Sequence, residues 1–150
     1  NLKYNGSVYS CRSLNLSTYL FIKTMSRTLI SSGSQWEPVI GYSRAVVVGN
    51  QVFVAGTTGA NADGSFTADM YEQTRRALEV IGGALNQAGA SFTHVVRSTV
   101  YTTDISQWEA IAKAHGEIFS EIRPAMALVE VSRLINPAML VEVEVTAVIV

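Results

Sequence analysis

The spacing of apolar residues predicts a first helix over residues 69–88. Within this segment, apolar and small side chains recur every three or four positions and form one stripe. Asp69 and Glu72 have the spacing of a capping box, which places the start of the helix. Gly82 and Gly83 each lower helix propensity by about 1 kcal/mol relative to alanine. We therefore expect another segment to pack closely against the helix at this point.

The same period predicts a second helix over residues 106–121. Ser106 and Glu109 have the spacing of a capping box at its start. Trp108 and His115 share its apolar face. A histidine on such a face is more often a core residue bonded to the backbone than a general base, so we interpret His115 as structural.

Short runs rich in β-branched residues precede, separate and follow the two helices. Gly49-Asn50 lies between two such runs, which is typical of a tight β-hairpin. Residues 31–41, which contain glycine, serine and proline, are expected to form a loop. Strands are predicted at residues 27–30, 44–48, 51–55, 95–103, 125–131 and 140–150.

This order of elements leaves one face of the predicted sheet uncovered, because two helices cover only one face. Both faces of the strands nevertheless carry apolar residues. In the strand over residues 125–131, for example, Met126 and Leu128 lie opposite Ala127 and Val129. An exposed apolar area of this size marks an interface. We infer a homo-oligomer in which the second faces of the sheets bury one another.

Residues 1–24 differ from the rest of the chain, since they carry three basic residues, no acidic residue and many serines and asparagines. The favoured interpretation is a non-native or flexible leader, translated upstream of a natural start at Met25 or derived from cloning. An organelle transit peptide comes second, because such segments are basic, serine-rich and acid-poor. A secretory signal comes last, because the apolar patch is too short. We predict a single domain over residues 25–150.

Composition narrows the possible partners of this 150-residue chain. The formal net charge is -1 and no basic stripe is visible, which argues against a nucleic-acid partner. No apolar run approaches the roughly 18 to 20 residues of a membrane span, so no membrane partner is expected. The single cysteine, Cys11, cannot form an internal disulfide and fits a reducing compartment. We expect a cytoplasmic protein, or one of an organelle matrix if the leader is a native transit segment.

Known cofactor motifs are absent from the sequence. There is no phosphate-binding loop of the GxxxxGK type, and the segment 56–59 (Gly-Thr-Thr-Gly) lacks the spacing of a dinucleotide-binding turn. His94 and His115 are not spaced as a metal-binding pair. We therefore expect neither a cofactor nor a metal ion.

Glu142 and Glu144 are the acids most suggestive of a site. Residues two apart on a strand point to the same side, and a carboxylate on a face buried by association is costly without a partner or a ligand. One hypothesis is an intersubunit salt bridge to Arg44, Arg97 or Arg133. The other is that a carboxylate lines a small cleft between subunits. The pattern favours neither.

Several short motifs, in order and at fitting distances over residues 25–150, resemble the Rid family (reactive intermediate deaminase, also called YjgF or L-PSP endoribonuclease). They are Ile40-Gly41-Tyr42-Ser43, the segment 49–56 (GNQVFVAG), the segment 73–78 (QTRRAL), the segment 89–96 (GASFTHVV), Pro124-Ala125, and Val141-Glu142-Val143-Glu144.

The resemblance implies a chorismate-mutase-like α+β subunit with a mixed β-sheet and two helices on one face. It also implies a homotrimer with a small-molecule cleft between neighbouring subunits. Well-studied members hydrolyse enamines and imines to ammonia and a 2-keto acid. By position, Tyr42 and Gly56 correspond to ligand-holding residues and Glu142 to the glutamate that positions the attacking water. Met126 stands where those members have the arginine that grips the substrate carboxylate, and Leu128, on the same strand face, completes the substrate-binding set.

The methionine departs from the deaminating pattern, because a thioether cannot neutralise a carboxylate. The expected function is therefore a trimer that binds, and as an enzyme would hydrolyse, a small imine, enamine or keto-acid-like metabolite, without ordinary 2-iminobutanoate deaminase activity. The alternative is a non-catalytic ligand-binding, chaperone-like or interaction trimer. An endoribonuclease ranks below both, because the chain has neither a basic stripe nor a histidine pair.

Overall fold

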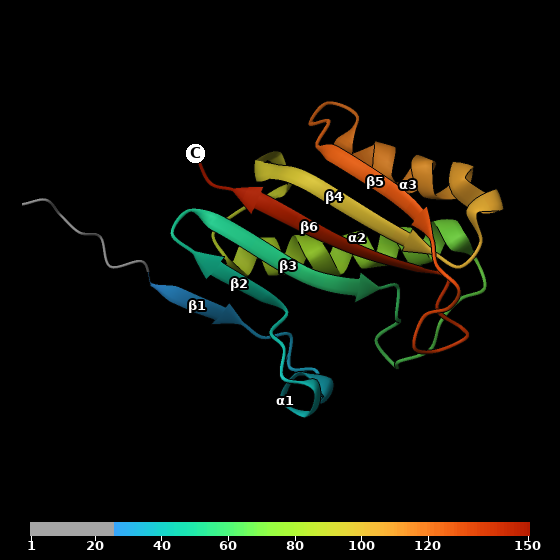
Figure 1. The fold of residues 1–150 in the computed structure, drawn as a ribbon, viewed down its shortest axis with the longest axis horizontal. Coiled ribbons are helices and arrows are strands. Elements are labelled where there is room, and N and C mark those ends of the chain that lie inside the picture. Colours follow the sequence, from blue (N-terminus) through green and yellow to red (C-terminus); the bar gives the residue numbers. More distant parts are fainter. Residues whose placement is uncertain (1–25) are drawn as a thin grey trace, which may run out of the picture.

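The computed structural model describes residues 26–150. In it the strands pair into one six-stranded sheet (Figure 1). The prediction about residues 1–24 lies outside this range. The strands are β1 (Arg27–Ile30), β2 (Ala45–Val48), β3 (Gln51–Thr58), β4 (Val95–Thr102), β5 (Ala125–Glu130) and β6 (Val141–Val148). The helices are α1 (Trp36–Ile40), α2 (Met70–Gln87) and α3 (Trp108–Phe119), with single 3-10 turns at Phe92–His94 and Ile105–Gln107.

The strand order is β1-β2-β3-β6-β4-β5. All neighbouring strands are antiparallel except β4 and β5, which are parallel and joined through α3. The last strand, β6, inserts between β3 and β4 at the centre of the sheet. The predicted α+β class with a mixed sheet is confirmed.

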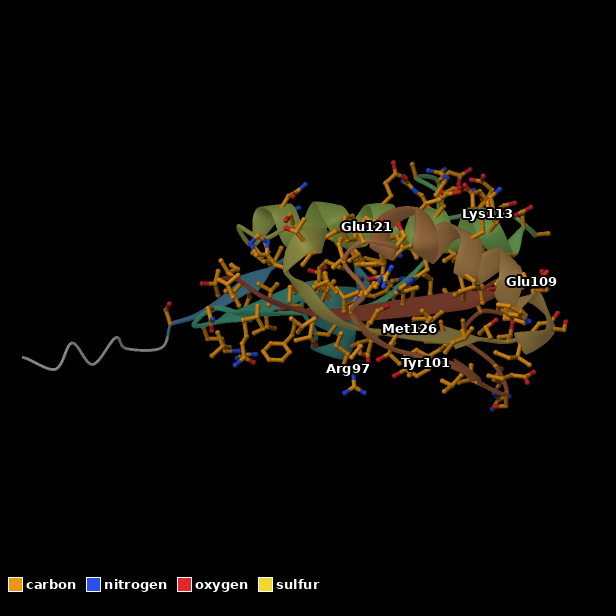
Figure 2. All side chains as sticks on the ribbon, turned by 90° about the horizontal axis from the view of Figure 1, so that it is seen from above. Arg97, Tyr101, Glu109, Lys113, Glu121 and Met126 are labelled. Carbon is orange, nitrogen blue, oxygen red and sulfur yellow. The ribbon has the colours of Figure 1, made fainter. Side chains whose placement is uncertain are left out.

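Both long helices lie on one side of the sheet, as Figure 2 shows. The α2 side chains Leu78, Ile81 and Leu85 are fully buried against the inward residues of β3 and β6. In β6 the inward positions Val141, Val143, Val145 and Ala147 are all buried, because alternate residues of a strand point to the same face. This layer of helix and sheet side chains is the core.

The opposite side of the sheet, called the open face below, carries the outward residues of all six strands. It is partly apolar: Leu29 is 55% exposed, Phe53 43% and Val129 41%. Glu142 and Glu144 of β6 lie on the same face. The predicted uncovered apolar face is thus present. Its burial by further copies of the chain stays a prediction.

The predicted loop over residues 31–41 contains the short helix α1. It is held by Glu37, a buried carboxylate that accepts hydrogen bonds from the Ser31 hydroxyl (2.5 Å) and from the backbone N–H and hydroxyl of Ser32 (2.9 and 2.7 Å). These bonds lower the pKa of Glu37. Five residues are too few to show a helical period, which is why the pattern did not predict this helix.

The predicted start of the second helix is wrong. The capping residue is Asp104, whose carboxylate accepts from the Ser106 N–H (3.0 Å) and opens a 3-10 turn before α3 begins at Trp108. Trp108 is 51% exposed rather than buried, because it occupies the first position of α3 at the edge of the contact with the sheet. The first-helix prediction is confirmed: the Asp69 carboxylate accepts from the Glu72 N–H (2.9 Å).

The two adjacent glycines of α2 have different surroundings. A Cβ on Gly82 would lie 2.9 Å from the Phe92 ring, so the predicted close approach is confirmed there, against a side chain. The Phe92 ring in turn packs edge-on against Phe119, with 5.5 Å between ring centroids. A Cβ on Gly83 would meet nothing within 4 Å.

This difference predicts opposite effects of two neighbouring substitutions. Gly83→Ala should raise the free energy of unfolding by about 0.5–1 kcal/mol, because alanine is the better helix former and no atom stands in the way. Gly82→Ala should be at least about 1 kcal/mol less stable than Gly83→Ala, because Phe92 and Phe119 must shift. Urea unfolding at one protein concentration measures both. Equal stability of the two variants would contradict the packing described.

Candidate functional site

The site is built where the pairing of β3 with β6 is interrupted. Val54 pairs with Val145, but the next pair along is Thr57 with Val143, so β3 has one residue more than β6 in this interval. Such a β-bulge re-aims the side chains and carbonyl groups next to it. Here it places Gly56 directly against Glu142.

Gly56 has to lack a side chain at this point. A Cβ built on it would collide with the Glu142 carboxylate, whose Oε1 is the nearest atom. The carboxylate therefore occupies the space that any other residue at position 56 would fill. This contact brings together two of the residues that the sequence assigned to the site.

Arg44, which precedes β2, joins Tyr42 to the bulge. Its Nη1 donates to the Gly56 carbonyl (2.9 Å) and to the Thr57 hydroxyl (2.7 Å), and its Nη2 donates to the Tyr42 hydroxyl (3.2 Å). The guanidinium carbon also lies 5.5 Å from the centroid of the Tyr42 ring. Sequence reasoning considered Arg44 only as an ion-pair partner. The signal that it missed is the register, which puts Arg44 beside the bulge.

Tyr42, Arg44, Gly56 and Glu142 are called the cluster below. The charged group that decides its electrostatics is Glu142. Burial, and the neighbouring charge of Glu144, raise the pKa of Glu142, while Arg44 opposes this shift. Glu144 accepts a hydrogen bond from the Tyr101 hydroxyl (3.3 Å), and burial together with Glu144 raises the pKa of Tyr101. Within residues 26–150, neither glutamate has a basic group within 4.0 Å. The intersubunit salt bridge therefore stays a prediction.

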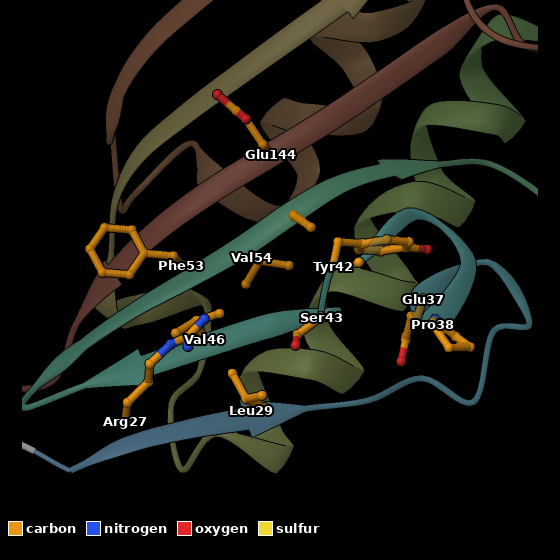
Figure 3. Close-up of a pocket in the computed structure, with 12 residues that line it drawn as sticks. Arg27, Leu29, Glu37, Pro38, Tyr42, Ser43, Val46, Phe53, Val54 and Glu144 are labelled. Atoms are coloured by element: carbon orange, nitrogen blue, oxygen red, sulfur yellow. The ribbon is translucent and has the colours of Figure 1, made fainter.

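A depression of about 740 Å³ lies beside this cluster on the open face (Figure 3). Tyr42 stands at one end and Phe53 at the other, with Glu144 on β6 along one rim. A second hollow, of about 220 Å³, lies between Phe53, Arg97 and Glu144. Of the cluster, Tyr42 lines the larger depression, whereas Arg44 and Glu142 are not among its lining residues. Glu144 lines both hollows of the open face.

Met126 and Leu128 lie elsewhere in the subunit. They are in register with Ser98 and Val100 of β4, which are fully buried on the helix side of the sheet. Figure 2 shows Arg97 and Tyr101 pointing away from the helices, on the other side. One chain therefore brings Tyr42, Gly56 and Glu142 together but does not bring Met126 and Leu128 to them. Met126 is 44% exposed at the edge strand.

His115 has the structural role expected of it, with a different partner. Its Nε2 is 3.2 Å from the Ser98 hydroxyl, rather than bonded to the backbone, and its ring packs at 4.4 Å on Phe119. Burial lowers the pKa of His115, which favours the neutral imidazole. In the part of the chain that the structure describes, no group of three or more histidine, cysteine or acidic side chains could hold a metal ion. No helix in that part is long and apolar enough to cross a membrane.

Comparison with known proteins gives consistent matches. A family model described as endoribonuclease L-PSP matches residues 32–149. The structure of Rv2704 from Mycobacterium tuberculosis, a member of the YjgF/YER057c/UK114 family, is 48% identical with a TM-score of 0.77, over 83% of this chain and 100% of that one. A RutC family protein of Pyrococcus abyssi is 38% identical over 73% of this chain and 88% of its own length. The 2-iminobutanoate/2-iminopropanoate deaminase of Capra hircus is 31% identical over 75% of this chain and 84% of its own.

The raised pKa of Glu142 predicts how stability changes with pH. Between the unfolded pKa near 4.5 and the higher folded pKa, the folded state binds more protons than the unfolded state. The free energy of unfolding should therefore fall as pH rises through this window. Glu142→Gln should remove that fall, and Glu144→Gln should reduce it, because the charge of Glu144 contributes to the shift. Urea unfolding of the three proteins from pH 4 to 8 tests this, and parallel curves for wild type and Glu142→Gln would contradict it.

Proposed function

The chain belongs to the endoribonuclease L-PSP family, also called YjgF or RutC, and from this premise we propose that it binds a small imine, enamine or keto-acid-like metabolite in clefts between the subunits of a homotrimer. Hydrolysis of the C=N bond is the reaction that the cluster supports. The observation that carries this proposal is the Glu142 carboxylate, which lies against Gly56 on the open face and has no ion-pair partner in its own subunit. Arg44 connects Gly56 to Tyr42.

The chemistry asked of Glu142 is that of a general base. A carboxylate with a raised pKa can take a proton from a water molecule while the water oxygen bonds to the imine carbon. This proton passes to the nitrogen and gives a carbinolamine. Transfer of the carbinolamine hydroxyl proton to the nitrogen, again through Glu142, lets the C–N bond break as the C=O bond forms, and ammonia and a 2-oxo acid leave. The raised pKa brings Glu142 closer to neutral pH, where a base is most effective.

In this proposal a second copy of the chain completes the cleft. The open face carries exposed Leu29, Phe53 and Val129 around its acids, which is costly in a lone subunit. Met126 and Leu128 lie on the other side of their own sheet, at its exposed edge. They can take part in a cleft with Glu142 only if they come from a neighbouring subunit. Such a cleft has an acid from one copy and an apolar edge strand from the next.

A second candidate is a trimer that binds its ligand without turnover, as a sensor or an interaction module. The observation in its favour is Met126, whose thioether supplies no charge to hold and orient an anionic imine. Ribonuclease action, which the family description names, ranks lower. The net charge is -1 and the only two histidines, His94 and His115, lie in different elements.

The enzymatic proposal predicts slow turnover of 2-iminobutanoate. An amino-acid oxidase generates the imine, and the rate of hydrolysis is measured as the rate at which the imine disappears. The goat deaminase, assayed in the same way, is the reference. We expect a rate at least about 100-fold below that reference, because a charged hydrogen bond of roughly 2–5 kcal/mol is missing at Met126. Met126→Arg should raise the rate, and Glu142→Gln in that background should remove the gain. A wild-type rate equal to the reference would contradict the role given to Met126.

The oligomer is tested separately. Light scattering on a chromatographic peak should give about three times the subunit mass of 16.2 kDa. Phe53→Lys, on the open face, should lower the mass toward that of one subunit, because it places a charge in the proposed contact. Glu79→Lys, on the outer face of α2, is the matched control and should leave the mass unchanged. A monomeric wild type at micromolar concentration would remove the intersubunit cleft.

A further inference from the structure

No step of the hydrolysis above uses Arg44, although its guanidinium lies inside the cluster. Resting on the proposed function, we propose that Arg44 binds the carboxylate of the ligand, with the acid group at the Glu142 end of the cleft and the apolar tail toward Met126. The ligand class is a short-chain 2-oxo or 2-imino carboxylate. Arg44 would then supply, from the opposite end of the cleft, the cation that position 126 lacks.

The position of the guanidinium is the first argument. It touches Tyr42 and Gly56, which are two of the three residues assigned to ligand contact or catalysis on the open face. The third, Glu142, lies against the same Gly56. A ligand that reaches the Glu142 carboxylate therefore comes within reach of Arg44 as well.

Rigidity is the second argument. Nη1 is bonded to the Gly56 carbonyl and the Thr57 hydroxyl, and the guanidinium lies over the Tyr42 ring. These contacts use one edge of the guanidinium and fix its plane. An arginine held in this way loses little freedom when it binds an anion, so its contact contributes more to affinity than that of a mobile side chain.

The unused hydrogen-bonding capacity of Arg44 is the third argument. Among residues 26–150 no carboxylate lies within 4.0 Å of it, and its Nη2 bonds only to the neutral Tyr42 hydroxyl. Its Nε is shielded from solvent and has no hydrogen-bond partner in the described chain. The Nη2 group carries a second N–H that Tyr42 does not use, and a ligand carboxylate would accept a charged hydrogen bond from it.

The other arginines are less suitable. Arg97 is exposed and in register with Thr146, so it lies toward the opposite end of β6 from Glu142. Arg123, at the end of α3, donates from its Nε to the Ser120 carbonyl. Arg27 lines the larger depression but is exposed, and no hydrogen bond or ion pair within residues 26–150 fixes its side chain. Arg44 is the arginine that combines a fixed plane with contact to the cluster.

A bound carboxylate would also change the charge balance at Glu142. The titratable or charged groups that face Glu142 are Glu144 on its own strand, Tyr101 on β4 and Arg44 before β2, whereas β3 contributes none. A second carboxylate beside Glu142 disfavours its ionised form further, and the two acids can share one proton. Binding is therefore expected to take up a proton and to tighten as the pH falls from 8 to 6.

Isothermal titration with 2-oxobutanoate, the hydrolysis product of 2-iminobutanoate, tests the proposal. Arg44→Gln should weaken binding by about 10- to 100-fold, and Arg44→Lys should weaken it less, because lysine keeps the charge but not the fork. Arg75→Gln, at an exposed ion pair on α2, is the matched control and should bind like wild type. Titrations in two buffers of different ionisation enthalpy measure proton uptake, which Glu142→Gln should abolish. Melting temperature and mass confirm folding; if Arg44→Gln does not fold, Arg44→Lys decides.

The outcomes separate this inference from the function on which it rests. Wild-type affinity in both Arg44 variants overturns the role of Arg44 and leaves the cleft intact. If the wild-type protein binds the uncharged analogue 2-butanone but not 2-oxobutanoate, the role of Arg44 is likewise overturned and the cleft remains. Wild-type protein that binds neither molecule overturns the proposed function, and this inference with it.

Discussion

The extra residue of β3 opposite β6 is the constraint on which the site depends. If β3 and β6 paired without the bulge, the backbone at position 56 would continue the regular ladder, and its carbonyl would point at a neighbouring strand. With the bulge, the Gly56 carbonyl accepts from Arg44 and the missing Cβ leaves room for the Glu142 carboxylate. Arg44 in turn holds the Tyr42 hydroxyl. Three side chains from two segments, Tyr42 and Arg44 before β2 and Glu142 in β6, thus take their positions from one irregularity in the sheet.

The open face is energetically unusual because it combines apolar side chains with partly buried acids. Glu142 and Glu144 repel each other, and within the described subunit neither has a basic partner at ion-pair distance. A protein surface selected for stability alone would pair these charges or replace them. The buried Glu37 shows the contrast, since three hydrogen bonds from Ser31 and Ser32 satisfy its carboxylate. The difference between a satisfied and an unsatisfied acid is the physical basis for assigning Glu142 to function.

Much of this architecture could be predicted from sequence because it follows from periodicity. The alternation in β6 and the stripe of α2 each bury one set of side chains, and the structure has both. Short-range exceptions could not be predicted in this way. The five residues of α1 show no period, and the side-chain bonds of Asp104 made a 3-10 turn the start of the second helical segment, which left Trp108 exposed.

The candidate site likewise has a part that could be predicted from the sequence and a part that could not. Glu142 was expected from the strand pattern and from a family resemblance, and Gly56 from the resemblance alone. Their contact depends on a bulge that no residue pattern marks in advance. Arg44 precedes a strand, where nothing in its sequence neighbours indicates that its guanidinium reaches across to β3. Long side chains that connect segments in register are set by tertiary packing, which a single sequence does not display. Met126 and Leu128 fall on the other side of the sheet because the register of β5 on β4 pairs them with the buried Ser98 and Val100.

The substitution at position 126 has a consequence for the polarity of the proposed cleft. An edge strand that presents methionine and leucine favours the apolar end of a ligand, and a guanidinium beside Glu142 favours its acid end. A 2-imino acid held in this direction would place its carboxylate, rather than its C=N carbon, near the base. Water activated by Glu142 would then be poorly aligned for attack, since a displacement of about 1 Å can reduce a rate about 100-fold. Tight binding of a keto acid and slow hydrolysis of the related imine are therefore compatible properties of one site, and both follow from which end of the cleft carries the positive charge.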